Sequence, residues 1–135
     1  MKTCELEGNA LDWAVATIDG RTIRRDPMGF GNKSEGGYWI WEEVPGGNIN
    51  KAVYQKIGRN YSPSTKWEQG GPLIDKIEGL EVRRWMESAP ESKYQAEIHS
   101  REGDWVAFGP TILIAAMRCM VASKLGDEVN LPSEL

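Results

Sequence analysis

The segment at residues 110–125 constrains the fold more than any other part of the chain, because it predicts a long helix that is apolar on nearly every side. Pro110 at its start and Gly126 just past its end are residue types typical of those two positions. Arg118 is the one charged residue in the middle of the segment. A helix that is apolar all round belongs in a core, so the rest of the chain has to cover it.

Two shorter helices are predicted upstream. The first, at residues 8–18, is amphipathic. Its apolar residues recur at the spacing of a single helical face and are Leu11, Ala14, Val15 and Ile18. The second is predicted at residues 72–78, because Pro72 suits the first position of a helix.

Short β-prone segments account for much of the remaining chain. The predicted strands lie at residues 22–25, 38–41, 80–86, 94–99 and 105–108. Tyr94, Ala96 and Ile98 alternate with polar residues, as in a strand with one buried face. The last three strands predict an antiparallel meander. Residues 51–57 fit either a strand, which we slightly favour, or one to two helical turns.

Together these elements predict an α+β fold. We expect a small, mostly antiparallel sheet packed against the N-terminal helix and the long buried C-terminal helix, with a layered sandwich as one arrangement of them. A length of 135 residues is most simply one domain. The glycine-rich stretch at about residues 26–50 is expected to be irregular or mobile.

Charge and cysteine content argue against several classes of protein. The net charge of −4 weighs against broad nucleic-acid binding, which usually shows as a basic balance. Cys4 and Cys119 are too few for a disulfide scaffold. No apolar run approaches the ~18 residues needed to span a membrane, and the first residues lack a signal-peptide pattern. We therefore expect a protein of a reducing cytoplasm without membrane contact.

The sequence offers little for catalysis or for a zinc site. His99 is the sole histidine, and the two cysteines lie far apart in the chain. Glu97, Glu102 and Asp104 lie near His99 and are able to bind a hard metal ion, but such groups are common in turns and at strand ends. We expect them to be ordinary exposed residues, and no cofactor is predicted.

The stretch at residues 60–72 is the most informative for function. It combines hydroxyl side chains, an indole ring and two glycines: Ser62, Ser64, Thr65, Trp67, Gly70 and Gly71. Hydroxyls and the N–H groups at a helix start favour anions, and glycines let a backbone approach a ligand. We therefore predict that these six residues bind an anion or a nucleotide, with Trp67 stacking on a base. Their spacing matches neither a phosphate-binding loop nor a dinucleotide fingerprint.

The alternative is that this stretch merely turns the chain. Ser and Thr hydroxyls often satisfy backbone groups within tight turns, and Trp67 would then fill the core. A binding site would also need positive charge, which Arg84 or Arg118 is predicted to supply. The alternatives are a solvated charge for Arg84, and for Arg118 a structural ion pair or a side chain that reaches the surface along the helix edge.

The aromatic run Tyr38-Trp39-Ile40-Trp41 suggests a contact surface. In a strand, Trp39 and Trp41 lie on one side and Tyr38 and Ile40 on the other. One side would pack on the core, so Trp39 and Trp41 are predicted to meet a partner protein or a second copy of the chain.

Three segments resemble the NinX-type proteins of lambdoid phages and enterobacterial prophages. They are LEGNALDWAVA (6–16), YSPSTKWEQGGP (61–72), and GPT (109–111) followed by AAMRC (115–119) and VASKLG (121–126). The resemblance implies a phage or prophage origin and a life in the cytoplasm of the bacterial host. The resemblance implies no particular reaction and no catalytic residue. A related group of small phage proteins forms a sandwich of a sheet between helical layers, which is compatible with the predicted elements.

The sequence therefore favours a phage accessory protein that works by binding. Its ligand is expected to be a small anionic or nucleotide-like molecule, or a host protein. One alternative is a metal-dependent enzyme acting on phosphorylated small molecules or nucleic acid, which predicts acidic residues converging beside residues 62–71. The other is a protein-interaction module built on the aromatic strand, which predicts an oligomer or a host partner.

Overall fold

The computed structural model describes residues 1–25, 37–46, 49–85, 89–132 and 135. Its helical elements are the 3₁₀ helices η1 (Thr3–Glu5) and η3 (Pro90–Ser92) and the α-helices α1 (Gly8–Ile18), α2 (Trp67–Asp75) and α3 (Ile112–Leu125). Its strands are β1 (Ile23–Arg25), β2 (Tyr38–Gly46), β3 (Ile49–Lys56), β4 (Leu80–Arg84), β5 (Tyr94–Ser100) and β6 (Gly103–Gly109). The α+β class is confirmed, but the strands form two antiparallel sheets, β1-β2-β3 and β4-β5-β6, where one was expected.

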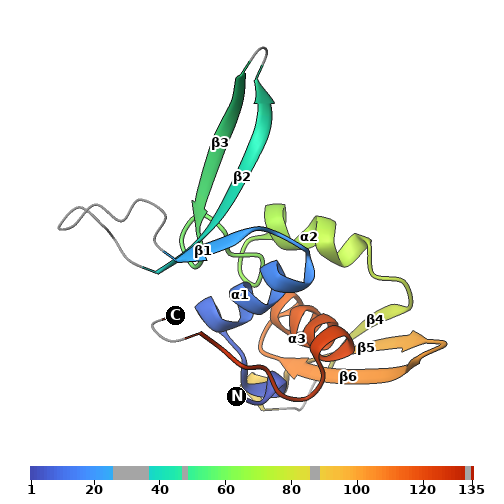
Figure 1. Cartoon of the computed structure of the whole chain (residues 1–135). Helices are drawn as coiled ribbons and strands as arrows, with labels where there is room; N and C mark the ends of the chain where they lie inside the picture. Colours follow the sequence, from blue (N-terminus) through green and yellow to red (C-terminus); the bar gives the residue numbers. More distant parts are fainter. Residues whose placement is uncertain (26–36, 47–48, 86–88, 133–134) are drawn as a thin grey trace.

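Helix α3 is the centre of the core, as its apolar sequence predicts. On one side it packs against α1, through Leu113, Met117 and Val121. On the other side Ala115 and Cys119 pack against the β4-β5-β6 sheet. The helix therefore lies between α1 and this sheet (Figure 1).

The start of α3 differs slightly from the prediction. The helix begins at Ile112, and Thr111 caps it by accepting the N–H of Ile114 on its side-chain oxygen at 3.1 Å. Pro110 therefore lies just outside the helix. A Thr cap satisfies one of the donors that the first turn leaves free.

The β4-β5-β6 sheet is the predicted meander. Ala96 and Ile98 of β5 are buried against α3, while Glu97 and His99 point to the opposite face. The predicted alternation in this strand is thus confirmed. In the register, Glu81 of β4 lies directly opposite Glu97.

The β1-β2-β3 sheet occupies part of the stretch expected to be irregular. Strand β2 runs through residue 46, well beyond the predicted end at residue 41, and pairs with β3 in a hairpin that projects from the rest of the molecule (Figure 1). Residues 51–57 are strand for nearly their whole length, as favoured. The remainder of the stretch, at residues 26–36 and 47–48, lies outside the described residues.

The prediction for the second helix was wrong at its start. Helix α2 begins at Trp67, and Pro72 lies inside it. The turn formed by Ser62 continues directly into the helix, because the N–H groups of Gln69 and Gly70 already donate to the carbonyl oxygen of Lys66. Pro72 removes a single helical hydrogen bond, and the short helix ends three residues later.

Candidate ligand-binding site

The bend before α2 is held by its own hydrogen bonds. The N–H groups of Thr65 and Lys66 donate to the carbonyl oxygen of Ser62 at 3.1 and 2.8 Å. The Gln69 side chain, on α2, accepts the N–H of Ser62 and donates to the carbonyl oxygen of Asn60. The bend is therefore a rigid connection fastened to the first turn of the helix.

Ser64 faces the interior and contacts a buried carboxylate. Its N–H donates to Oδ1 of Asp12 at 2.9 Å, and both residues are almost fully buried, with exposed fractions of 1% and 2%. Burial raises the pKa of Asp12, and the backbone and side chain of Ser64 partly oppose that rise. The Ser64 hydroxyl is close enough to influence the carboxyl group but has no hydrogen bond of normal geometry to any described residue.

A cavity of about 420 Å³ adjoins this bend. Its lining comes from the bend, from the start of β5 and from the start of α3. The lining residues are Ser64, Thr65, Trp67, Lys93, Tyr94, Pro110, Thr111, Ile112, Leu113 and Ile114. Among them Lys93 is the only charged residue, so the lining favours an anion.

Two helix starts contribute to this cavity. Trp67 is the first residue of α2, and Ile112 and Leu113 are the first two of α3. The N–H groups of a first helical turn carry partial positive charge. Those of Gln69 and Ile114 already donate to Lys66 and Thr111, which leaves the N–H groups of the residues before them. The backbone therefore adds to the charge of Lys93.

Two aromatic rings line the same cavity, and a second cation lies beside one of them. The Trp67 side chain is 55% exposed, so it is a surface ring and not a core plug. The Tyr94 ring lies 5.8 Å from Nζ of Lys93 and 5.9 Å from Cζ of Arg84. Arg84, which was predicted to supply charge, is thus next to a lining residue.

Four other predicted ligand-binding residues lie outside the lining. The side chain of Ser62 is buried. A Cβ atom at Gly70 would stand 2.2 Å from the carbonyl oxygen of Pro63 and 2.7 Å from Cδ2 of Leu113, so this glycine permits close packing within the protein. At Gly71 the nearest atom would be 3.8 Å away, so no close approach requires a glycine there.

Arg118, the fourth, is bound internally. Its Nε and Nη1 donate to the carbonyl oxygens of Leu6 and Phe108, both at 2.8 Å. Burial lowers the pKa of its guanidinium group, and the charge of Glu7 partly offsets this. Its partners in these two bonds are backbone carbonyls, one of the partner types expected for a guanidinium on a mostly buried helix.

The predicted contact residues Trp39 and Trp41 are half-buried. Cζ of Arg59 lies 5.5 Å from the Trp39 ring, and Cζ of Arg24 lies 4.8 Å from the Trp41 ring. Trp41 also meets Tyr54 edge to face, with the ring centroids 4.5 Å apart. The two indoles are therefore partly covered by the protein itself.

A second cavity, of about 460 Å³, was not foreseen from the sequence. It lies where the three α-helices end beside the β5–β6 turn. Its charged residues are balanced between Asp19, Glu78 and Glu102 on one side and Lys76, Arg101 and Lys124 on the other. Helix C-terminal ends carry partial negative charge, so this cavity suits an anion less well than the first.

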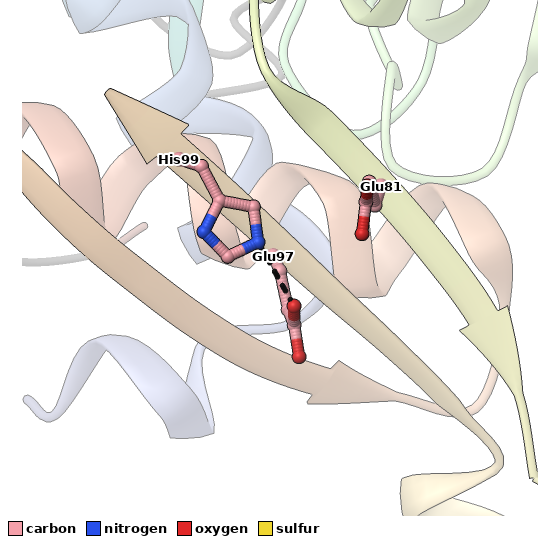
Figure 2. Close-up of side chains that lie close together, drawn as sticks. All are labelled: Glu81, Glu97 and His99. Carbon is pink, nitrogen blue, oxygen red and sulfur yellow. Dashed lines mark hydrogen bonds and ion pairs between the residues drawn. The ribbon is translucent and has the colours of Figure 1, made fainter. Parts of the chain in front are cut away.

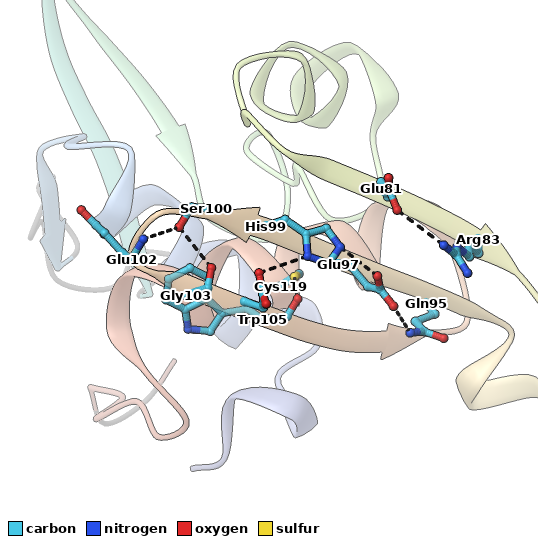
Figure 3. Close-up of polar contacts among 11 residues, drawn as sticks. Glu81, Arg83, Gln95, Glu97, His99, Ser100, Glu102, Gly103, Trp105 and Cys119 are labelled. Carbon is cyan, nitrogen blue, oxygen red and sulfur yellow. Dashed lines mark hydrogen bonds and ion pairs between the residues drawn. The ribbon is translucent and has the colours of Figure 1, made fainter.

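Three potential metal ligands meet on the outer face of the β4-β5-β6 sheet, namely Glu81, Glu97 and His99 (Figure 2). Hydrogen bonds to Asp104 and then Glu97 raise the pKa of His99. Figure 3 shows the surrounding polar contacts, in which Glu102 donates its backbone N–H to Ser100. Glu81 was missed from the sequence because its place opposite Glu97 depends on strand register.

Comparison with known proteins identifies the family. A sequence model described as Bacteriophage P22, NinX matches residues 2–124. The chain belongs to the phage NinX family. The resemblance noted in the sequence is thereby confirmed. No curated protein matches this NinX-family chain.

The fold of this NinX-family protein has a crystallographic counterpart. It is similar to a phage protein from Bacillus cereus ATCC 14579, solved at 2.0 Å, with a TM-score of 0.56 and 19% sequence identity. The match covers 87% of this chain and 92% of that chain. At this identity the similarity concerns the fold alone. Across the described part of the chain, no helix is long and apolar enough to cross a membrane.

Proposed function

We propose that this NinX-family protein is a non-enzymatic phage accessory protein that binds a small anionic, nucleotide-like ligand in the bacterial host. The ligand occupies the cavity between the starts of α2 and α3, which we call the anion cavity and define by the lining residues given above. The anionic group faces Lys93 and the first turn of α3, and a planar ring stacks on Trp67.

The observation that carries this proposal is the one-sided charge of the lining. Lys93 and two helix starts supply positive potential, and no carboxylate lies among the described residues that line the cavity. An exposed indole at the rim adds a stacking surface for a base, an interaction worth about 1–3 kcal/mol in comparable sites.

The metal-dependent enzyme has weaker support. It requires acidic residues beside the bend, whereas the carboxylates that approach one another, Glu81 and Glu97, lie on the opposite face of β5 from the cavity residue Tyr94. A bound phosphate ester would therefore not meet those carboxylates.

Thermal unfolding with a panel of nucleotides tests the proposal. A nucleotide that binds should raise the midpoint temperature of unfolding in a concentration-dependent way. It should also quench tryptophan fluorescence, and both effects should weaken with added salt. Lys93→Gln and Trp67→Ala should each reduce the affinity about tenfold or more, by loss of the charge or of the stacking ring.

Matched controls separate this site from general effects. Lys124→Gln removes a lysine that lines the other cavity, and Trp41→Ala removes a half-buried indole of the β2–β3 hairpin that does not line the anion cavity. Both variants should bind like the wild type. If no nucleotide shifts the midpoint, or if the control variants lose binding equally, the anion cavity is not the binding site.

A further inference from the structure

The outer face of the β4-β5-β6 sheet brings three metal-ligating side chains together. Glu81 on β4 lies opposite Glu97 on β5, and His99 lies two residues along β5 on the same face. One donor atom from each side chain lies within 4.8 Å of the others. Figure 2 shows the imidazole and the Glu97 carboxylate side by side on β5, with Glu81 on the neighbouring strand.

The imidazole of His99 is held in an orientation suited to a metal. Its Nδ1 lies 3.1 Å from Oδ1 of Asp104, which is its register partner on β6. Its Nε2 lies 3.0 Å from Oε2 of Glu97. Histidines that bind metals commonly donate one ring N–H to a carboxylate. Asp104 fills that role at Nδ1, and an ion bound by Nε2 would take the place of the direct contact between Nε2 and Glu97.

The Glu97 carboxylate is oriented in a similar way. Its Oε1 accepts a hydrogen bond from Nε2 of Gln95, which leaves Oε2 facing His99 (Figure 3). Two of the three ligands therefore have supporting contacts in place before any ion is bound.

Charge also favours a cation at this point. Like charges directly opposite one another in an antiparallel pair destabilise a sheet, and Glu81 and Glu97 are such a pair. Arg83 offsets this only in part, since its Nη2 lies 3.6 Å from Oε2 of Glu81 and its side chain is 61% exposed. A divalent ion between the carboxylates would remove the repulsion.

We propose that Glu81, Glu97 and His99 bind one divalent transition-metal ion of the zinc class. An imidazole nitrogen and carboxylate oxygens are zinc ligands, and three protein ligands leave a position for water. Donor atoms around a tetrahedral zinc ion stand about 3.3 Å apart, so the exposed Glu81 side chain has to rotate toward the other two. The site is independent of the anion cavity, which lies on the other side of β5.

Nuclear magnetic resonance on the tag-free, chelator-treated chain gives a direct test, because His99 is the sole histidine and its ring signals are unambiguous. Stoichiometric Zn²⁺ should shift the imidazole nitrogen and carbon signals, with the change centred on Nε2. Mg²⁺ prefers all-oxygen ligation, so it should leave these signals unchanged at the same concentration. Calorimetry should give one zinc ion per chain.

Variants locate the ion. His99→Gln, Glu97→Gln and Glu81→Gln should each weaken zinc binding about tenfold or more. Glu102→Gln removes one nearby negative charge without removing a ligand, so it should bind like the wild type. Arg83→Gln removes the cation that competes for Glu81, so it should bind zinc more tightly.

Glu81, Arg83, His99 and Glu102 are exposed and Glu97 is half-buried. Unchanged thermal unfolding without metal would show that each variant folds. The proposal is overturned if Zn²⁺ leaves the His99 signals in place. It is equally overturned if His99→Gln retains wild-type affinity, because the ion would then lie on other residues.

Discussion

Arg118 in α3 donates its Nε proton to the carbonyl oxygen of Leu6 at 2.8 Å, across 112 residues of sequence. With its second bond, to the carbonyl oxygen of Phe108, this side chain ties the segment before α1 and the end of β6 to the central helix. A guanidinium is suited to this role because several donors project from one rigid plane.

Substitution of Arg118 should therefore reduce stability in a graded order. Arg118→Lys keeps a charge but cannot reproduce both bonds, and Arg118→Met leaves both carbonyls without a donor. We expect Arg118→Met to lower the free energy of unfolding by about 2–5 kcal/mol, with Arg118→Lys in between. Urea unfolding measures the free energy of unfolding of both variants. A methionine variant as stable as the wild type would contradict this role.

Adjacent glycines in α2 should respond in opposite ways to the same change. Gly70→Ala places a methyl group against Pro63 and Leu113 and should cost about 1–3 kcal/mol. Gly71→Ala meets nothing closer than 3.8 Å and replaces a weak helix former, so it should stabilise the protein by roughly 0.5–1 kcal/mol. Thermal unfolding of the two variants measures these changes. Equal changes in stability would show that Gly70 is not packed more tightly than Gly71.

The buried Asp12 should make stability fall as pH rises. Burial raises its folded-state pKa above the model-peptide value of 3.8, so the folded protein holds this proton where the unfolded chain has released it. The stability that the protonated carboxyl contributes is complete below pH 3.8 and is lost as pH rises through the folded pKa. One such group changes stability by at most about 1.4 kcal/mol per pH unit.

Two variants at this position isolate the effect. Asp12→Asn keeps an oxygen for the N–H of Ser64 and removes the buried charge, so its stability relative to the wild type should improve as pH rises above 3.8. Asp12→Ala leaves that N–H without an acceptor and should cost about 1–3 kcal/mol below pH 3.8, and this cost should shrink at higher pH as the wild type loses stability. Urea unfolding at several pH values tests both, and parallel pH profiles for wild type and Asp12→Asn would contradict the assignment.

The two cysteines should differ sharply in reactivity. Burial raises the pKa of Cys119 to about 11, and its thiol donates to the carbonyl oxygen of Trp105 at 3.4 Å. Cys4 is exposed. Because the thiolate is the reactive form, Ellman's reagent at pH 8 should titrate one thiol in the folded protein and two in denaturant. Modification of both at the same rate in the folded state would show that the interior around Cys119 opens readily.

Elements with a strong local pattern were predictable from sequence. Helix α1 has the predicted bounds, because its apolar spacing is regular along its whole length. Burial of α3 followed from its composition. The start of α2 was misplaced because Pro72 suits a first position in general, and nothing local reveals that the Ser62 turn continues into the helix.

The candidate sites depend on contacts that local patterns do not contain. Ser64, Thr65 and Trp67 were singled out, yet Lys93 joins them only through the packing of β5 beside α3. Glu81 faces Glu97 through strand register, and a shift of one residue would turn its side chain to the other face. Gly70 was predicted to let a ligand approach the backbone. Its actual neighbour is Leu113, and a contact between residues so far apart in sequence cannot be read from the local pattern.

The β2–β3 hairpin pairs from Trp39 opposite Lys56 to Gly46 opposite Ile49, and its base packs against α1 through Ile40 and Ile57. Cross-strand residue pairs could be added to or removed from the outer part of this hairpin without disturbing the hydrophobic cluster around α3. Evolutionary change in length should therefore be tolerated in this arm. Lineages that infect different hosts are expected to diverge there first, while the residues that surround α3 change slowly.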